Sequence, residues 1–121
     1  MSIVEHQRQE TRDRIFRASA WFTEVHEDLK VWTSEGRIFG IDHNGTRHYA
    51  TYQFSGDGKP LRVVQKILQQ LGANDPWAIA AWFEFPNSWI SAASAVSPKE
   101  VLDNEGLVLH AATRQAGSYI A

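Results

Sequence analysis

The sequence contains no cysteine, which excludes disulfide bridges, zinc fingers, iron–sulfur sites and thiolate nucleophiles. It also lacks a dominant charge: 12 Lys and Arg stand against 14 Asp and Glu, so the formal net charge is −2 and no general attraction to nucleic acid is expected. No apolar run reaches the roughly 18 residues of a membrane span, and the charged first residues do not predict a signal peptide. These absences predict a soluble, cytoplasmic protein.

The chain has 121 residues, of which 43% are hydrophobic, and this is enough for one compact unit with one core. The predicted fold class is α+β, a small and mostly helical domain with one β-hairpin. Residues 1–60 are expected to form a degenerate helix-turn-helix plus the hairpin, a winged-helix-like half. Residues 61–121 are expected to form a helical half within the same unit.

Apolar residues recur three or four apart between Gln7 and Glu35, which predicts one apolar helical face. The spacing fits a single long helix, or two helices with a break over residues 20–23 and Thr23 as the cap of a second helix, 24–34. In both versions Gly36 ends the helical stretch. A homodimer formed through this face is expected. The face consists of Ile15, Ala18, Phe22, Val25, Leu29 and Trp32.

The dipeptide Asn44-Gly45 predicts a type I′ turn, because both residues tolerate the positive φ angles that this turn requires. It lies between two β-prone runs, residues 38–41 and 49–54. A two-residue loop at this dipeptide fixes the register of the hairpin. The expected pairs are His43 with Thr46, Asp42 with Arg47 and Ile41 with His48.

Helical signals return after residue 60. An apolar stripe over residues 61–71 stops at Gly72, and Asp75-Pro76 opens a helix that is apolar nearly all round. Ser97 to Glu100 form a capping box that starts a short helix, and the apolar run 107–111 predicts a last helix before Gly117.

The histidines and carboxylates do not stand at the spacing of any common metal or phosphate motif. Asp42, His43 and His48 could share a metal ion across the hairpin, which would make a small metal-dependent enzyme. Polar residues on a solvated hairpin are the commoner explanation for this trio. We therefore expect no metal, no cofactor and no catalytic residue.

A DNA-binding regulator is a further alternative, with the hairpin acting as the wing beside the second helix. The second helix opposes this interpretation, because it carries several carboxylates against one lysine and would repel phosphates. The residues that such a wing would offer to DNA are Arg37, His43, Arg47 and His48.

Five tryptophans are many for a chain of this size. Trp32, Trp77 and Trp82 lie on apolar helical faces and are expected in the core. Trp21 and Trp89 lie near predicted element ends, and we expect at least one of them to be exposed as an anchor for a partner protein.

The segment WFEFPNSWI, residues 82–90, followed by SPKEVL, residues 97–102, resembles the toxin-binding domain of Xre/MbcA/ParS-like antitoxins. In that family a Trp-rich helix ends in Pro-Asn and a Thr/Ser-Pro helix comes next. The upstream chain is similar to a family variant with a degenerate helix-turn-helix, and the resemblance spans roughly residues 20–112. Family members usually place Gly-Gly or Gly-Arg where this chain has residues 91–96. The further matching positions are Trp32, Gly36 to Phe39, Asn44-Gly45, Tyr49 to Phe54 and Asp75 to Trp77.

The resemblance implies an antitoxin without catalytic activity that binds and sterically neutralises a cognate RES-type toxin, an enzyme that consumes NAD. It implies no cofactor and no metal. Its expected partner is the toxin protein, with operator DNA as a second partner and no membrane. The toxin-binding residues that follow are Trp89, Ile90, Lys99, Tyr119, Ile120 and Ala121.

Overall fold

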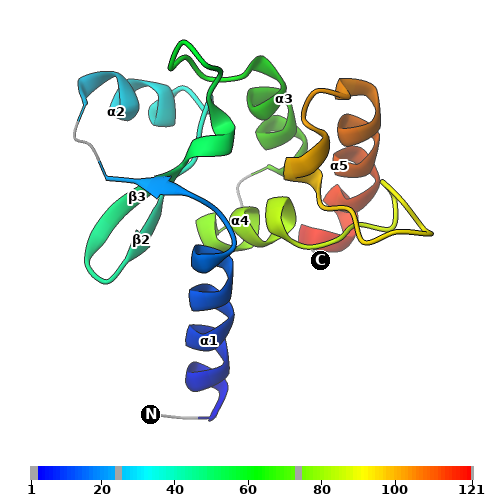
Figure 1. Cartoon of the computed structure of the whole chain (residues 1–121), viewed down its shortest axis with the longest axis horizontal. Coiled ribbons are helices and arrows are strands. Elements are labelled where there is room, and N and C mark those ends of the chain that lie inside the picture. The colour runs from blue at the N-terminus through cyan, green and yellow to red at the C-terminus, as the bar shows by residue number, and fades with distance from the viewer. Residues whose placement is uncertain (1–2, 24–25, 73–74, 121) are drawn as a thin grey trace.

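The computed structural model describes the backbone of residues 3–23, 26–72 and 75–120, and it shows a small α+β domain, which confirms the predicted fold class (Figure 1). A three-stranded antiparallel sheet has the order β1-β3-β2. No helix in the described part of the chain is long and apolar enough to cross a membrane. The elements are α1 (Ile3–Arg17), β1 (Trp21–Phe22), α2 (Glu27–Ser34), β2 (Ile41–His43), β3 (Thr46–Ala50), η1 (Thr51–Gln53), α3 (Arg62–Leu71), α4 (Pro76–Glu84), η2 (Pro98–Val101) and α5 (Glu105–Ile120).

The N-terminal part contains two helices separated by a strand. Strand β1 pairs with β3, so that Trp21 lies opposite Ala50 and Phe22 opposite Tyr49. Thr23 is not the cap of the second helix: α2 begins at Glu27, and its N-cap is His26, whose ring nitrogen accepts a hydrogen bond from the Asp28 amide at 3.1 Å. The two helices are therefore joined through a strand and not through a short helix-turn-helix loop.

The apolar face expected over α1 and α2 is divided between two cores. Ile15 is buried in the main core, Leu29 is buried in a smaller cluster, and Val25 lies outside the described residues. The inserted strand explains the difference, because it interrupts the helical period. Ile15 and Leu29 are covered by other residues of the same chain, so they do not form a surface for a second copy. The homodimer stays a prediction, and this face no longer supports it.

The hairpin has the predicted register, with Ile41 opposite His48, Asp42 opposite Arg47 and His43 opposite Thr46. Asn44 and Gly45 have φ angles of 52° and 79°, in the left-handed region that the turn requires.

The strand boundaries differ from the prediction. Residues 38–40 do not pair with a strand, and β3 ends at Ala50. The reason is the fully buried Gln53, which takes the place of a strand. Its side-chain oxygen accepts from the Phe39 amide at 2.8 Å and its side-chain nitrogen donates to the Phe39 carbonyl at 3.0 Å.

The C-terminal helices follow the predicted signals closely. Gly72, with φ 73°, ends α3, and Pro76 opens α4. Ser97 and Glu100 form both bonds of the capping box, but the turn that they start is a 3₁₀ helix. The expectation that the last helix stops before Gly117 is wrong, because the backbone of α5 continues to Ile120. A glycine only weakens a helix, and no proline follows to end it.

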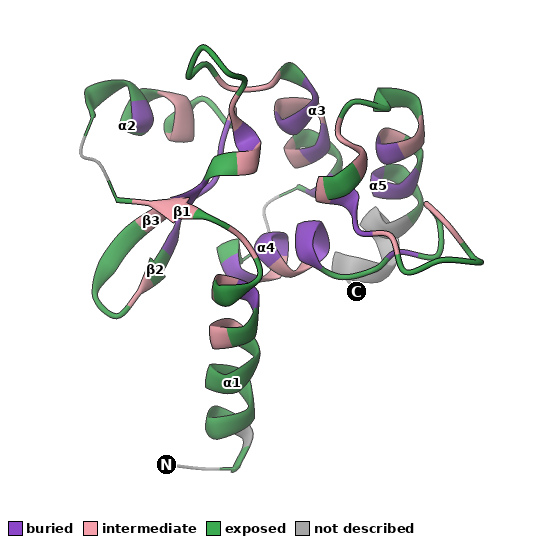
Figure 2. Cartoon of the chain, viewed as in Figure 1, coloured by how far each residue is buried: buried purple, intermediate pink, exposed green. Residues whose placement is uncertain are grey.

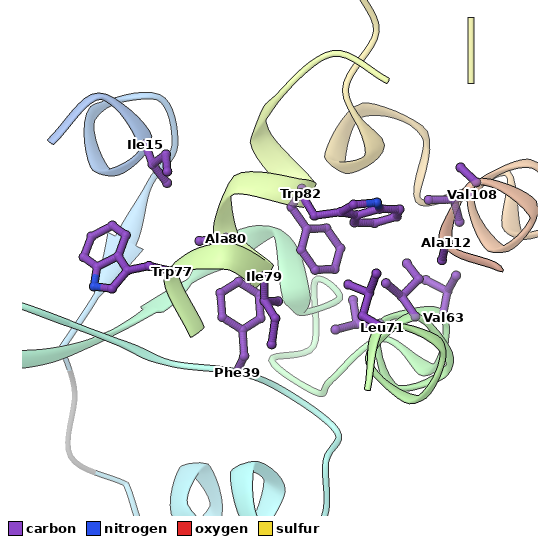
Figure 3. Packing of buried hydrophobic residues seen from close by; sticks show 14 of the residues in the cluster. Ile15, Phe39, Val63, Leu71, Trp77, Ile79, Ala80, Trp82, Val108 and Ala112 are labelled. Atoms are coloured by element: carbon purple, nitrogen blue, oxygen red, sulfur yellow. The ribbon is translucent and has the colours of Figure 1, made fainter. Parts of the chain in front are cut away.

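The main core lies where α4 packs between α1 on one side and α3 and α5 on the other (Figures 1 and 3). Trp82 and Phe83 of α4 are 4% and 0% exposed. Buried residues of both expected halves, Phe39 and Val108 among them, belong to this one core.

A smaller cluster of Leu29, Ile38 and Tyr49 attaches α2 to the sheet. The N-terminal part of α1 extends away from both clusters and is exposed (Figure 2).

Candidate functional site

The clearest surface feature is the segment that links α4 to η2, which carries two exposed aromatic residues, Phe85 at its first position and Trp89 at its fifth. Trp89 is 46% exposed and Phe85 is 38% exposed, and each ranks among the exposed large hydrophobic residues of the described chain. The linking segment, residues 85–97, contains no charged side chain. We call it the Trp89 loop. An indole on such a loop can enter a partner's pocket without bringing a charged residue of the loop with it.

Asn87 organises the Trp89 loop from within. It is 5% exposed, and its backbone N–H donates to the Val96 carbonyl at 2.9 Å, which closes the loop across its neck. Its side-chain oxygen accepts from the Trp89 amide at 2.9 Å, and its carbonyl accepts from the Ile90 and Ser91 amides. In the resemblance, Pro-Asn only marks the end of a helix, so this role of Asn87 was not predicted.

Two side chains of α5 hold the Trp89 ring. The Arg114 guanidinium lies 5.5 Å from the ring centroid, and the His110 ring meets Trp89 edge-on at 6.1 Å between centroids. Ile90 is half-buried and packs against the main core. The structure therefore places the two predicted residues Trp89 and Ile90 in different roles, Trp89 facing outward and Ile90 fixing the loop to the core.

Lys99 is engaged inside the protein. Its ammonium lies 2.8 Å from a carboxylate oxygen of Glu84, and it donates to the Ser19 hydroxyl at 2.7 Å and to the Ala18 carbonyl at 2.8 Å. The Ser19 hydroxyl in turn donates to the second oxygen of Glu84. The Glu84 side chain is only 2% exposed, so this is a buried ion pair with a hydroxyl between its partners.

The remaining predicted toxin-binding residues lie at the end of α5. The helical backbone includes Tyr119 and Ile120, whose side chains lie outside what the structure describes, and Ala121 lies outside the described residues altogether. Their role stays a prediction.

The hairpin histidines turn toward α1. The His43 side chain is 11% exposed, stacks on Phe16 with 4.1 Å between ring centroids, and lies 3.2 Å from a carboxylate oxygen of Asp13. This hydrogen bond is the main reason that the pKa of Asp13 is lower than usual. His48 meets Phe16 edge-on at 4.8 Å between ring centroids, and its Nδ1 lies 2.9 Å from the Thr46 carbonyl oxygen. His43 is thus packed in the protein and not presented to a DNA backbone.

The two arginines of the proposed wing already have partners. The Arg47 Nε–H donates to Asp42 at 2.6 Å, and this hydrogen bond lowers the pKa of Asp42. Arg37 lies over the Trp32 ring at 5.8 Å from its centroid, and it is 3.9 Å from a carboxylate oxygen of Glu35. Binding of operator DNA stays a prediction, and these contacts do not favour it.

The three residues of the metal-site alternative, Asp42, His43 and His48, do not assemble. Asp42 and His43 are neighbours on one strand, so their side chains point to opposite faces of the sheet, Asp42 toward Arg47 and His43 toward Phe16. In the described ranges of the chain, no group of three histidines and carboxylates could hold a metal ion. The metal-enzyme alternative loses its site for this reason.

A groove that sequence reasoning missed lies between α2 and the turn at residues 55–59. It has a volume of about 560 Å³. Three half-buried rings, Phe22, Trp32 and Phe54, line it, and they contact one another at centroid distances of 5.4 and 6.1 Å.

Comparison with protein-family models, with curated proteins and with solved structures finds no match to this chain.

Proposed function

We propose that this chain is a binding protein that neutralises a toxin, with the Trp89 loop as the centre of the contact. The observation that carries the proposal is the state of Trp89: a large aromatic ring, 46% exposed, on a loop without charge. Tryptophan is among the residues that contribute most to protein interfaces when a partner buries it.

The neighbourhood of Trp89 has the composition of an interface. Phe85 adds a second exposed ring near the start of the loop, and Arg114 and His110 supply a polar margin from α5. A stable interface buries about 1,200–2,000 Å² in total, which is more than one loop provides. The exposed face of α5 next to the loop is the natural extension of the contact.

The identity of the partner rests on the resemblance of residues 82–102 to the antitoxin family. It makes the partner a RES-type toxin, and the mechanism is steric. The loop and α5 cover the entrance to the toxin's NAD site, so the substrate is excluded. The neutralising chain needs no catalytic group, cofactor or metal ion for this role.

The direct test uses the product of the neighbouring reading frame, purified together with this chain. NAD consumption by that product should fall when the wild-type chain is added. The variant Trp89→Ala should bind about 30-fold more weakly, equivalent to roughly 2 kcal/mol, because the buried indole is lost. Isothermal titration calorimetry measures the affinity.

The control variant is Val31→Ala, which removes an apolar side chain that is 51% exposed on α2, in a different part of the molecule from the Trp89 loop. It should bind like the wild type. Equal affinity of Trp89→Ala and wild type would remove Trp89 from the mechanism, and a neighbouring product that neither binds nor consumes NAD would contradict the proposed function.

A further inference from the structure

We infer that Lys99 is a positioning residue that holds the two ends of the Trp89 loop together and so presents Trp89 to its partner. The inference rests on the proposed function. It assigns to Lys99 an indirect role, in place of the direct toxin contact that the family resemblance implies.

The position of the ion pair carries the inference. Glu84 is the last residue of α4 and Lys99 is the second residue of η2, so their contact at 2.8 Å joins the elements on either side of the loop. The same ammonium donates to the Ala18 carbonyl, just beyond the C-terminal end of α1. One side chain therefore fixes both loop ends to a third element.

The ion pair is largely shielded from water. The side chains of Glu84 and Lys99 are 2% and 22% exposed. Removing one partner leaves a buried, uncompensated charge, which is strongly unfavourable. The ion pair is thus expected to persist whenever the domain is folded.

Apart from the packing of Ile90 on the core and the contacts of Trp89 with α5, the loop is held by hydrogen bonds within it. Residues 91–95 are small, being only serine and alanine, and residues 92–95 are exposed. Order inside the loop comes mainly from the Asn87 contacts. The Asn87 to Val96 hydrogen bond requires the first and last residues of the loop to stay close. Holding the ends together keeps Trp89 ordered before binding, so less conformational entropy is lost on association.

The test replaces both partners at once, as Glu84→Gln with Lys99→Met, because a neutral pair avoids an isolated buried charge. The matched control is Asp42→Asn with Arg47→Met. These residues form an ion pair at 2.6 Å between β2 and β3, with side chains 68% and 49% exposed, on the hairpin and outside the proposed binding surface (Figure 1). Two quantities are measured: amide hydrogen exchange of the free protein, and affinity for the purified product of the neighbouring reading frame.

The Glu84/Lys99 variant should exchange its Trp89, Ile90 and Ser91 amides about tenfold faster than the wild type, with α3 amides unchanged. Its affinity should be about three- to tenfold weaker, which corresponds to ordering one or two side chains on binding. The Asp42/Arg47 control should change neither quantity. If the doubly neutral variant does not fold, Ser19→Ala serves instead. It removes one hydrogen-bond partner from each of the two charges and should give a smaller effect in the same direction.

The outcomes separate the two proposals. Weaker binding with unchanged loop exchange would mean that Lys99 touches the partner directly, which overturns the positioning role. Unchanged binding and unchanged exchange would overturn it as well. Faster loop exchange in the free protein, together with no binding even by the wild type, would support the role of Lys99 in ordering the loop and contradict the proposed function.

Discussion

The hydroxyl of Tyr52 is buried and finds no hydrogen-bond partner among the described residues. Its ring packs against Phe83 at 5.2 Å between centroids. Burial raises the pKa of Tyr52 well above its ordinary value, and the negative charge of Glu84 adds to the increase. The ring therefore contributes to the core, while the hydroxyl costs about 1–3 kcal/mol because it loses its bonds to water.

Tyr52→Phe is expected to raise the free energy of unfolding by about 1 kcal/mol at pH 7, since it removes an unpaired polar group and keeps the ring. The advantage should grow above pH 10. There the unfolded tyrosine loses its proton, whereas the folded one, with its raised pKa, keeps it, so ionisation of Tyr52 lowers the stability of the wild type and has no counterpart in the variant. Urea unfolding at pH 7 and pH 10.5 measures both effects.

Tyr49→Phe is the contrasting variant, because the Tyr49 hydroxyl interacts with Arg47. Its removal should lower stability at pH 7. A Tyr52→Phe protein that is less stable than the wild type at pH 7 would show that the hydroxyl has a partner after all.

Single residues that act over long sequence separations were the hardest to predict. Ser19, Glu84 and Lys99 meet although Ser19 is 65 and 80 positions from its two partners, and no periodic pattern connects them. One signal was present, because Glu84 is the only charged residue in the helix 76–84. A charge at the end of an otherwise apolar helix indicates a buried partner. The prediction from local element ends that at least one of Trp21 and Trp89 is exposed is confirmed, because Trp89 is 46% exposed.

Among the secondary-structure elements, the hairpin depends on close backbone packing at Gly40. A Cβ atom at this position would lie 2.7 Å from Arg47 Cδ and 2.9 Å from Tyr49 Cε1. The Arg47 side chain is exposed and can move, but Tyr49 is 7% exposed and belongs to the core beneath α2. A glycine is thus required at position 40, because a larger residue would displace the Tyr49 ring.

Gly40→Ala should lower the free energy of unfolding by about 1–3 kcal/mol, the usual range for overpacking. The matched control is Gly56→Ala, where a Cβ atom meets nothing within 4 Å and φ is not positive. That variant should be neutral or more stable by up to about 1 kcal/mol, because alanine restricts the unfolded chain. Urea denaturation compares the two variants, and equal stability of both would contradict the packing argument.

Local chemistry explains which elements were predictable. The Asn44-Gly45 turn, the Gly72 end of α3 and the Pro76 start of α4 each follow from backbone preferences of one or two residues. Strand β1 was missed because it has only two residues and takes its partner, Ala50, from 29 positions along the chain. The shortened strands were missed because a side chain, Gln53, substitutes for backbone pairing.

For the molecule as a whole, two hydrophobic clusters of unequal size divide the described chain. The main core unites α1, α3, α4 and α5, whereas α2 buries only Leu29, in the small cluster with Ile38 and Tyr49. A helix with one buried side chain has little tertiary support, and an eight-residue helix is unstable alone. We therefore expect α2 to open without unfolding of the main core.

Leu29→Ala should lower the opening free energy of the α2 amides by about 2–3 kcal/mol, as for other buried leucines, and leave the α3 amides nearly unchanged. Leu71→Ala, which truncates a fully buried leucine of the main core, should lower the opening free energy of the α3 amides and, by favouring global unfolding, of the remaining protected amides. Native-state hydrogen exchange at low urea resolves these amides. If Leu29→Ala lowers the opening free energies of the α2 and α3 amides equally, the two clusters unfold as one cooperative unit. In that case α2 cannot move independently of the elements that hold the Trp89 loop.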